Sequence, residues 1–373
     1  MNTTQVQRIN ILRGLAILLV FCYHAIYSVF GTFEIYDYKP YMVVYNFSQY
    51  PLKRILLTLT PLSTGQGTTL FLVLSGFLLH RGYLKSGSAF SWPAFFNKRF
   101  WRIYPPYLVA LLFFSLAVGS GGAFSFLTHL TLTHNLFPST IISINPSFWS
   151  LALEAQLYLL YPAFLWMRSQ WGLKRTLWRL GTVTLVGVPA VILSGKHLLI
   201  NLPFNTWVVW GLGAYLAEQL HYGRRLFTGR PVYLLLAAVL LLLLKMTPLS
   251  PLYGRVIFGL FYICTIDWYL HRPERPDSRV GALAAKTMAL VGVYSYSIYL
   301  FHHPFMRELI LFFSYDDTSK LSLALGVTTT FLLFFGVAWV SYHVLEQPSI
   351  RLGRWFYQRY FAKAPRALAT AAA

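Results

Sequence analysis

Long apolar segments recur along the whole chain and are separated by short polar loops. About 20 apolar residues in a helix cross the hydrocarbon core of a bilayer, and ten segments approach that length. They are 10–30, 66–84, 103–122, 148–168, 180–195, 203–220, 231–247, 254–271, 288–306 and 321–344. The chain is only 11% charged, against about 25% in soluble domains, so it cannot cover a surface that faces water. We therefore predict an all-α, polytopic membrane bundle of about ten transmembrane helices.

Basic residues mark one side of this bundle. With ten spans and both ends on one side, 23 of the 31 Lys and Arg residues lie on that side and eight on the other. Because basic loops stay in the cytoplasm, we expect both termini there, and the largest loops, 31–65 and 122–147, outside. The basic residues in these loops account for the formal net charge of +20. Such a charge can indicate nucleic-acid binding, but no segment of the chain is polar enough to form a nucleic-acid-binding domain. We expect one transmembrane domain over 1–350 and a basic cytoplasmic tail over 351–373.

The cysteines and the paired histidines argue against a disulfide or a metal site. Cys22 and Cys264 both lie inside apolar runs. His302 and His303 lie near the outer end of the ninth span. Adjacent residues on a helix point about 100° apart, which is poor geometry for binding one ion. We therefore expect no metal.

The first span carries two ionisable residues, which are costly inside a membrane and indicate function. Arg13 and His24 are eleven residues apart, so they share nearly the same helix face and are separated by about 16 Å along the axis. One helix then presents a cation near the cytoplasmic boundary and an imidazole deep in the membrane. The alternatives are an arginine that reaches the interface with its head group and a core histidine bonded to a neighbouring helix.

Glu154 lies in the fourth span, at a depth comparable to that of His24. A carboxylate and an imidazole at one level form a plausible general-base pair, in which the carboxylate orients the ring. An interhelical hydrogen bond with a purely structural role would give the same pattern.

Arg99 and Arg102 lie three residues apart, just before the third span. On a helix they share a face, which suits the binding of phosphate groups at the cytoplasmic surface. The alternative is an ordinary membrane anchor, because basic and aromatic residues often flank a span.

Six segments together resemble the acyltransferase-3 family of integral membrane acyltransferases, and the resemblance covers about residues 8–350. They are RINILRGLAILLVFCYHA, GTTLFLVLSGFLL, FFNKRFWRIYPPY, SFWSLALEAQLYLLYP, YSYSIYLFHHPF and HVLEQP. The chain resembles the stand-alone members, which lack a fused extracytoplasmic esterase-like domain.

The resemblance implies transfer of an acyl group, often acetyl from acetyl-CoA, to a hydroxyl of a carbohydrate or another acceptor. The family's arginine–histidine pair falls on Arg13 and His24, its paired arginines on Arg99 and Arg102, and its glutamate on Glu154. We expect the three arginines to hold the phosphates of acyl-CoA, a donor substrate rather than a resident cofactor. His24 is then the expected base, oriented by Glu154.

The expected location is the bacterial inner membrane, and the expected acceptor is a cell-envelope or secreted carbohydrate, or a lipid-linked glycan. Proteins of envelope-glycan assembly are further expected partners. One alternative is acylation of a small glycosylated metabolite. Another is a secondary transporter or flippase for a sugar, since ten spans and a basic inner face also suit that class. The sequence leaves the roles of Ser75, Tyr299, His302 and His303 open.

Overall fold

A computed structural model describes residues 3–30, 36–39, 42–45, 65–119, 121–195, 201–244, 249–273, 278–316 and 319–361. The first half of the chain contributes α1 (Thr3–Phe30), β1 (Tyr36–Lys39), β2 (Met42–Tyr45), α3 (Gly67–Ser86), α4 (Trp92–Ala117), α5 (Ala123–Leu130), α6 (Trp149–Leu159) and α7 (Tyr161–Leu193). The second half contributes α8 (Pro203–His221), α9 (Pro231–Leu244), α10 (Leu249–His271), α11 (Arg279–Val293), α12 (Ser295–Phe301), α13 (Met306–Phe313), α14 (Lys320–Ser341) and α15 (Gln347–Tyr360). Short 3₁₀ turns lie at Gly87–Ala89 and His134–Leu136, and a π-helical segment at Tyr342–Glu346.

The structure is helical, as predicted. One exception lies in residues 31–65, which were predicted to form an outer loop and which contain two strands. There β1 and β2 pair antiparallel as a hairpin, with Tyr36 opposite Tyr45 and Lys39 opposite Met42. These are the only strands among the described residues, and 46–64 of the same loop lie outside them.

Several helices are suited to a lipid environment. Four helices of the described chain are long and apolar enough to cross a membrane: Thr3–Val29, Trp92–Ala117, Tyr161–Leu193 and Lys320–Tyr360. Large apolar side chains face outward on the surface, and Leu116 is 88% exposed. Exposed apolar surface on this scale is unstable in water and stable against acyl chains. The protein is therefore an integral membrane protein. The number of ten spans and the cytoplasmic location of both termini remain predictions.

Two predicted spans have different boundaries in the structure. The third begins earlier than position 103, because α4 starts at Trp92 and runs through Pro105 and Pro106 without a break. Arg99 and Arg102 consequently lie within a long helix. The fourth predicted span, 148–168, is divided between α6 and α7. In turn α7 is interrupted at Gly172, whose φ of 74° and ψ of 156° favour glycine.

The ninth predicted span, 288–306, is not a continuous helix. It consists of the end of α11, a break at Tyr294, the short α12, and a turn over residues 302–305. His302 and His303 therefore lie beyond the end of a helix. The predicted angle between their side chains, which assumed a helix, does not apply.

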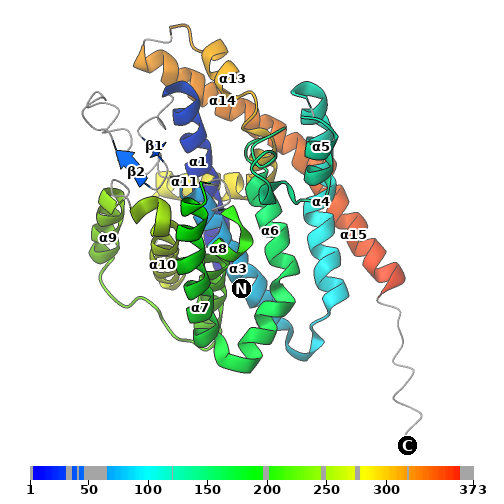
Figure 1. The fold of residues 1–373 in the computed structure, drawn as a ribbon, viewed down its shortest axis with the longest axis vertical. Coiled ribbons are helices and arrows are strands. Elements are labelled where there is room, and N and C mark those ends of the chain that lie inside the picture. The colour runs from blue at the N-terminus through cyan, green and yellow to red at the C-terminus, as the bar shows by residue number, and fades with distance from the viewer. Residues whose placement is uncertain are drawn as a thin grey trace, which may run out of the picture.

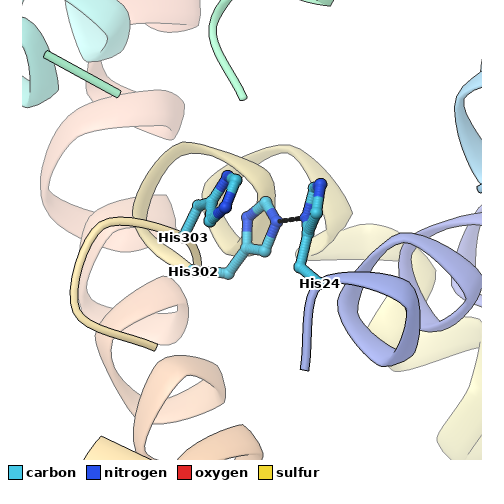
Figure 2. A group of neighbouring side chains, drawn as sticks. All are labelled: His24, His302 and His303. Atoms are coloured by element: carbon cyan, nitrogen blue, oxygen red, sulfur yellow. Dashed lines mark hydrogen bonds between the residues drawn. The ribbon is translucent and has the colours of Figure 1, made fainter. Parts of the chain in front are cut away.

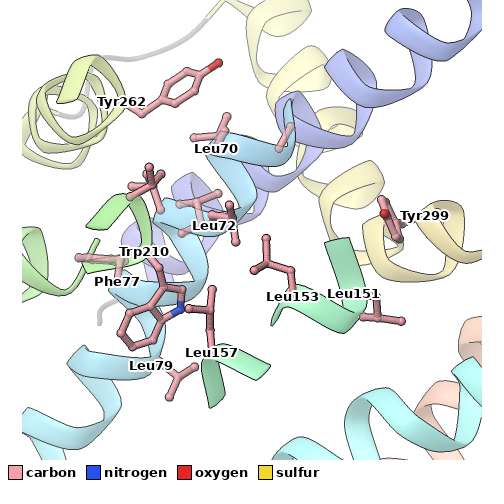
Figure 3. Packing of buried hydrophobic residues seen from close by; sticks show 14 of the residues in the cluster. Leu70, Leu72, Phe77, Leu79, Leu151, Leu153, Leu157, Trp210, Tyr262 and Tyr299 are labelled. Carbon is pink, nitrogen blue, oxygen red and sulfur yellow. The ribbon is translucent and has the colours of Figure 1, made fainter. Parts of the chain in front are cut away.

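Glycine residues allow pairs of helices in the bundle to pack backbone against backbone. A Cβ at Gly292 of α11 would overlap the carbonyl oxygen of Asn10 on α1, and one at Gly14 of α1 would overlap that of Met288. Gly213 of α8 meets α3 in the same way. Around this framework α3, α6, α8 and α10 bury one continuous apolar cluster that includes Trp210 (Figure 3).

The C-terminal helices form one long run from α14 through the π-helical segment into α15 (Figure 1). α15 packs on α4, where Gly353 lies against the ring of Trp101 and its carbonyl accepts a hydrogen bond of 2.8 Å from Asn97 Nδ2. This helix runs across the predicted boundary between 350 and 351. Residues 362–373 of the predicted tail lie outside the described chain.

Candidate active site

A cavity that opens to solvent lies among α1, α3, α4, α6 and α12, with about 900 Å³ of empty space when its open mouth is included. We call it the arginine pocket. Its lining comprises Arg13, Thr68, Phe71, Leu72, Leu74, Ser75, Leu78, Arg99, Arg102, Ile103, Ser150, Leu151, Glu154, Tyr158, Ser295, Tyr296 and Tyr299. Four of the five predicted site residues are in this set, and only His24 is absent. The structure therefore brings together the three arginines and the glutamate, which the sequence analysis placed on the first span, just before the third span and on the fourth span.

The three arginines of the pocket are partly buried and form no ion pair with an acidic residue of the described chain. Arg13 donates a hydrogen bond of 3.0 Å from Nη2 to Ser295 Oγ, and the guanidinium of Arg99 lies 5.4 Å from the centre of the Tyr158 ring. Nε of Arg99 is buried and has no hydrogen-bond partner among the described residues. Within the described residues, no carboxylate forms an ion pair with Arg13, Arg99 or Arg102. Such a set of cations favours a multivalent anion.

Glu154 has partners other than the predicted one. Its Oε1 accepts a hydrogen bond of 2.8 Å from Ser75 Oγ and a second one from Tyr158 OH. No hydrogen bond joins it to His24 in the described structure. Two residues at the same depth in the membrane need not face each other, because each helix can be rotated about its own axis. In the structure, α6 is rotated so that Glu154 faces the arginine pocket.

His24 instead belongs to an imidazole cluster that also contains His302 and His303 (Figure 2). Nδ1 of His24 and Nε2 of His302 are 2.8 Å apart. The ring of His303 stacks on that of His24, with 4.1 Å between centroids and 15° between planes. His302 is the C-cap of α12 and keeps helical dihedral angles, whereas His303 lies in the turn that follows. Sequence reasoning noted the adjacent pair but missed its contact with the first span.

A short segment before and at the start of α6 connects the imidazole cluster to the pocket. Asn145 Nδ2 donates a hydrogen bond of 3.2 Å to the carbonyl of Leu300, at the end of α12. Ser147 Oγ and His303 Nδ1, in the turn that follows, are hydrogen-bonded at 2.7 Å. Tyr299 OH is hydrogen-bonded to Ser150 Oγ at 2.7 Å and donates to the carbonyl of Ser147. Tyr299 lines the pocket, and its ring centre is 5.6 Å from that of His302. The pocket and the cluster are therefore neighbours.

Glu346 is a further residue that the sequence prediction missed. It is 2% exposed, lies in the π-helical segment, and accepts a hydrogen bond of 3.2 Å from Ser297 Oγ. It interacts electrostatically with Arg13 and Arg102. A π-helical segment inside a long helix is frequently found at a functional site. The signal available in the sequence was a lone carboxylate, in HVLEQP, at the end of an apolar run.

A pocket with three arginines that form no ion pair within the described residues, beside a histidine cluster, is the kind of site expected of an enzyme that handles an anionic donor. The profile of the acyltransferase-3 family, described as an acyltransferase domain, matches residues 6–343. The chain belongs to this family and is a membrane acyltransferase. Neither the curated proteins nor the solved structures that were searched gave a match.

Proposed function

We propose that the protein transfers an acetyl group from acetyl-CoA to a hydroxyl of a cell-envelope or secreted carbohydrate. The observation that carries the proposal is the arginine pocket, with three partly buried guanidinium groups that form no ion pair within the described residues. CoA carries phosphates on its nucleotide and diphosphate, and guanidinium groups bind phosphate oxygens in pairs. The adjacent apolar lining suits the uncharged pantetheine arm.

His24 supplies the base in this proposal. Its imidazole takes the proton of the acceptor hydroxyl while the oxygen attacks the thioester carbonyl, and the C–S bond then breaks. The imidazolium returns the proton to the departing CoA sulfur. Imidazole is suited to both steps near neutral pH. Since His24 lies outside the lining of the arginine pocket, the acceptor and the donor approach from different directions, with the acceptor on the outer side.

Acetyl-CoA binding tests the donor assignment. Acetyl-CoA should raise the thermal midpoint of the detergent-purified wild type by a few degrees, as a ligand does when it binds only the folded state. Arg13→Ala and the double variant Arg99→Ala/Arg102→Ala should lose that rise. Arg175→Ala is the matched control, because this arginine is exposed outside the pocket, and it should respond like the wild type.

Substitution of His24 separates an acyltransferase from a transporter. His24→Asn should abolish acetyl transfer to a glycan acceptor and retain the stabilisation by acetyl-CoA. A folded wild-type protein that saturating acetyl-CoA fails to stabilise would contradict the proposal and favour a sugar transporter. We propose the bacterial inner membrane as the location, with the arginine pocket open to the cytoplasm, since that compartment holds acetyl-CoA.

A further inference from the structure

The hydrogen bonds of the imidazole cluster determine which nitrogen of each ring carries hydrogen. His302 Nδ1 lies 2.9 Å from the carbonyl oxygen of Tyr299. A carbonyl can only accept, so Nδ1 of His302 must carry the hydrogen. A second hydrogen, on Nε2, would place a full charge on a ring with 0% exposure and no carboxylate partner in the described structure, which is costly. The Nε2 atom of His302 is therefore an acceptor.

This assignment fixes the tautomer of His24. The atom that faces His302 Nε2 at 2.8 Å is His24 Nδ1, which must donate. In a neutral ring the other nitrogen, His24 Nε2, then has a free lone pair. That atom points away from His302 and makes no hydrogen bond within the described residues (Figure 2). His24 is held ready to accept a proton at Nε2.

His303 restrains the plane of the same ring. It stacks on His24, and its own Nδ1 is within 2.7 Å of Ser147 Oγ, on the segment that precedes α6. The histidine that does the chemistry is thus fixed at one edge by His302 and on one face by His303.

The three rings are also close enough to raise the question of a metal ion, since one nitrogen of each lies within 4.8 Å of the others. A histidine lone pair lies in the plane of its ring, so three ligands must point their planes at one centre. Here His24 and His303 are nearly parallel, and the facing nitrogens of His24 and His302 already share a hydrogen bond. The arrangement favours a hydrogen-bond relay over a metal site.

We infer that His302 is a positioning residue, which uses the Tyr299 carbonyl as its anchor to hold His24 in the tautomer with a free Nε2. The inference rests on the proposed role of His24 as the base. It assigns to an imidazole the part that a carboxylate plays in a Ser-His-Asp triad, namely to fix the tautomer and to keep a hydrogen bond to the imidazolium as it forms. Glu154, which the sequence suggested for this part, is bound elsewhere.

Two substitutions of His302 separate this role from packing. In His302→Gln the amide oxygen can still accept from His24 Nδ1, whereas His302→Leu fills the space without an acceptor. We expect kcat to fall on the order of 100-fold in the Leu variant, which is the size of effect that general-base catalysis contributes. In the Gln variant kcat should fall less than about 10-fold. The stabilisation by acetyl-CoA should be unchanged in both. Equal loss in the two variants, or a loss confined to KM, would overturn the inference.

Nitrogen NMR of protein labelled with ¹⁵N-histidine tests the tautomer without any need for activity. The signals of His24 are identified by their absence in His24→Asn. We expect protonated Nδ1 and unprotonated Nε2 in the wild type and in His302→Gln, and a mixture of tautomers in His302→Leu. A protonated Nε2 in the wild type, or one equivalent of Zn²⁺ shifting all three histidines together, would refute the relay. The expected tautomer in a protein that lacks acetyl transfer would support the relay and refute the proposed function.

Discussion

The arginine pocket contains three cations that form no ion pair within the described residues and one carboxylate, Glu154, that accepts two hydrogen bonds. Both donors of Glu154, Ser75 and Tyr158, contact the same oxygen, Oε1. The other oxygen makes no hydrogen bond within the described residues, although its residue lines the cavity. Glu154 also interacts electrostatically with Arg13 and Arg99. Its carboxylate therefore opposes the binding of an anionic donor while offering an acceptor atom to a hydroxyl.

Replacement of this carboxylate by an amide should separate the two effects. In Glu154→Gln the oxygen can still accept from Ser75 and Tyr158, so the fold should persist. We expect acetyl-CoA to bind as tightly or several-fold more tightly, since a negative charge leaves the surroundings of the arginines. Turnover should fall at least about 10-fold, because an amide NH₂ cannot accept from the acceptor hydroxyl.

Calorimetric titration with acetyl-CoA and a steady-state assay measure these two quantities. Glu308→Gln is the control, since Glu308 is exposed at the start of α13 and should leave both unchanged. Weaker acetyl-CoA binding in Glu154→Gln would show that the carboxylate supports the donor site.

At the scale of elements, the contact between α1 and α11 positions the site. Gly14 and Gly292 allow the two backbones to touch, and they adjoin Arg13 and the segment that begins at Tyr294. The hydrogen bond from Arg13 to Ser295 depends on that approach. Backbone contact of this kind is a general device of membrane helices, where small residues replace the hydrophobic effect as the source of close packing.

Substitution of one of these glycines should therefore affect both stability and donor binding. In Gly292→Ala the new methyl would overlap the Asn10 carbonyl, so α11 must move away from α1. We expect the thermal midpoint to fall by several degrees, as for other overpacked contacts, and acetyl-CoA to stabilise the variant less. Gly336→Ala is the matched control, because nothing lies within 4 Å of a Cβ there. Equal midpoints for the two variants would argue against a tight α1–α11 contact.

The loop between the third and fourth predicted spans contains a buried pair of stacked histidines. His129 and His134 are each 0% exposed, and their ring centroids are 3.8 Å apart. Burial lowers the pKa of His134 to about 3 and also lowers the pKa of His129. In the unfolded chain both titrate near pH 6.5. Between pH 6.5 and about 3 the unfolded state therefore binds protons that the folded state excludes.

Because of these two histidines, stability should decrease as the pH falls below about 6.5. We expect the thermal midpoint of the wild type to drop by a few degrees between pH 7 and pH 5. His134→Phe should show a smaller drop, because it preserves the stacking and removes one titrating group. An identical drop in the variant would assign the pH dependence to other groups.

For the molecule as a whole, the apolar segments predicted where helices form but not how they are rotated or broken. The length and hydropathy of a segment are properties of its composition, so the helices could be located from the sequence. The contact of His24 with His302 and His303 depends on where α12 ends and on tight backbone packing, which no local pattern encodes. The grouping of Arg13 with Arg99 and Arg102 agrees with the resemblance to the family, which supplied the expectation that they act together.

The arrangement around the arginine pocket supports a specific topology. Arg13 lies in the first half of α1, Arg102 in the first half of α4 and Glu346 just after α14, and the three interact electrostatically. The start of α1 and the end of α14 therefore face the same end of the bundle. Together with the distribution of basic residues, this favours two cytoplasmic termini and an outer loop between α13 and α14.

Reporter fusions in a bacterial host test this topology. Alkaline phosphatase, which is active only outside the cytoplasm, should be active when fused after Asp316 and inactive when fused after Phe361. Green fluorescent protein, which fluoresces when it folds in the cytoplasm, should give the reverse pattern. Phosphatase activity after Phe361 would place the end of α15 outside, and the arginine pocket would then open away from the compartment that holds acetyl-CoA. That result would contradict the proposed direction of acyl transfer, whereas the family membership and the imidazole relay would stand.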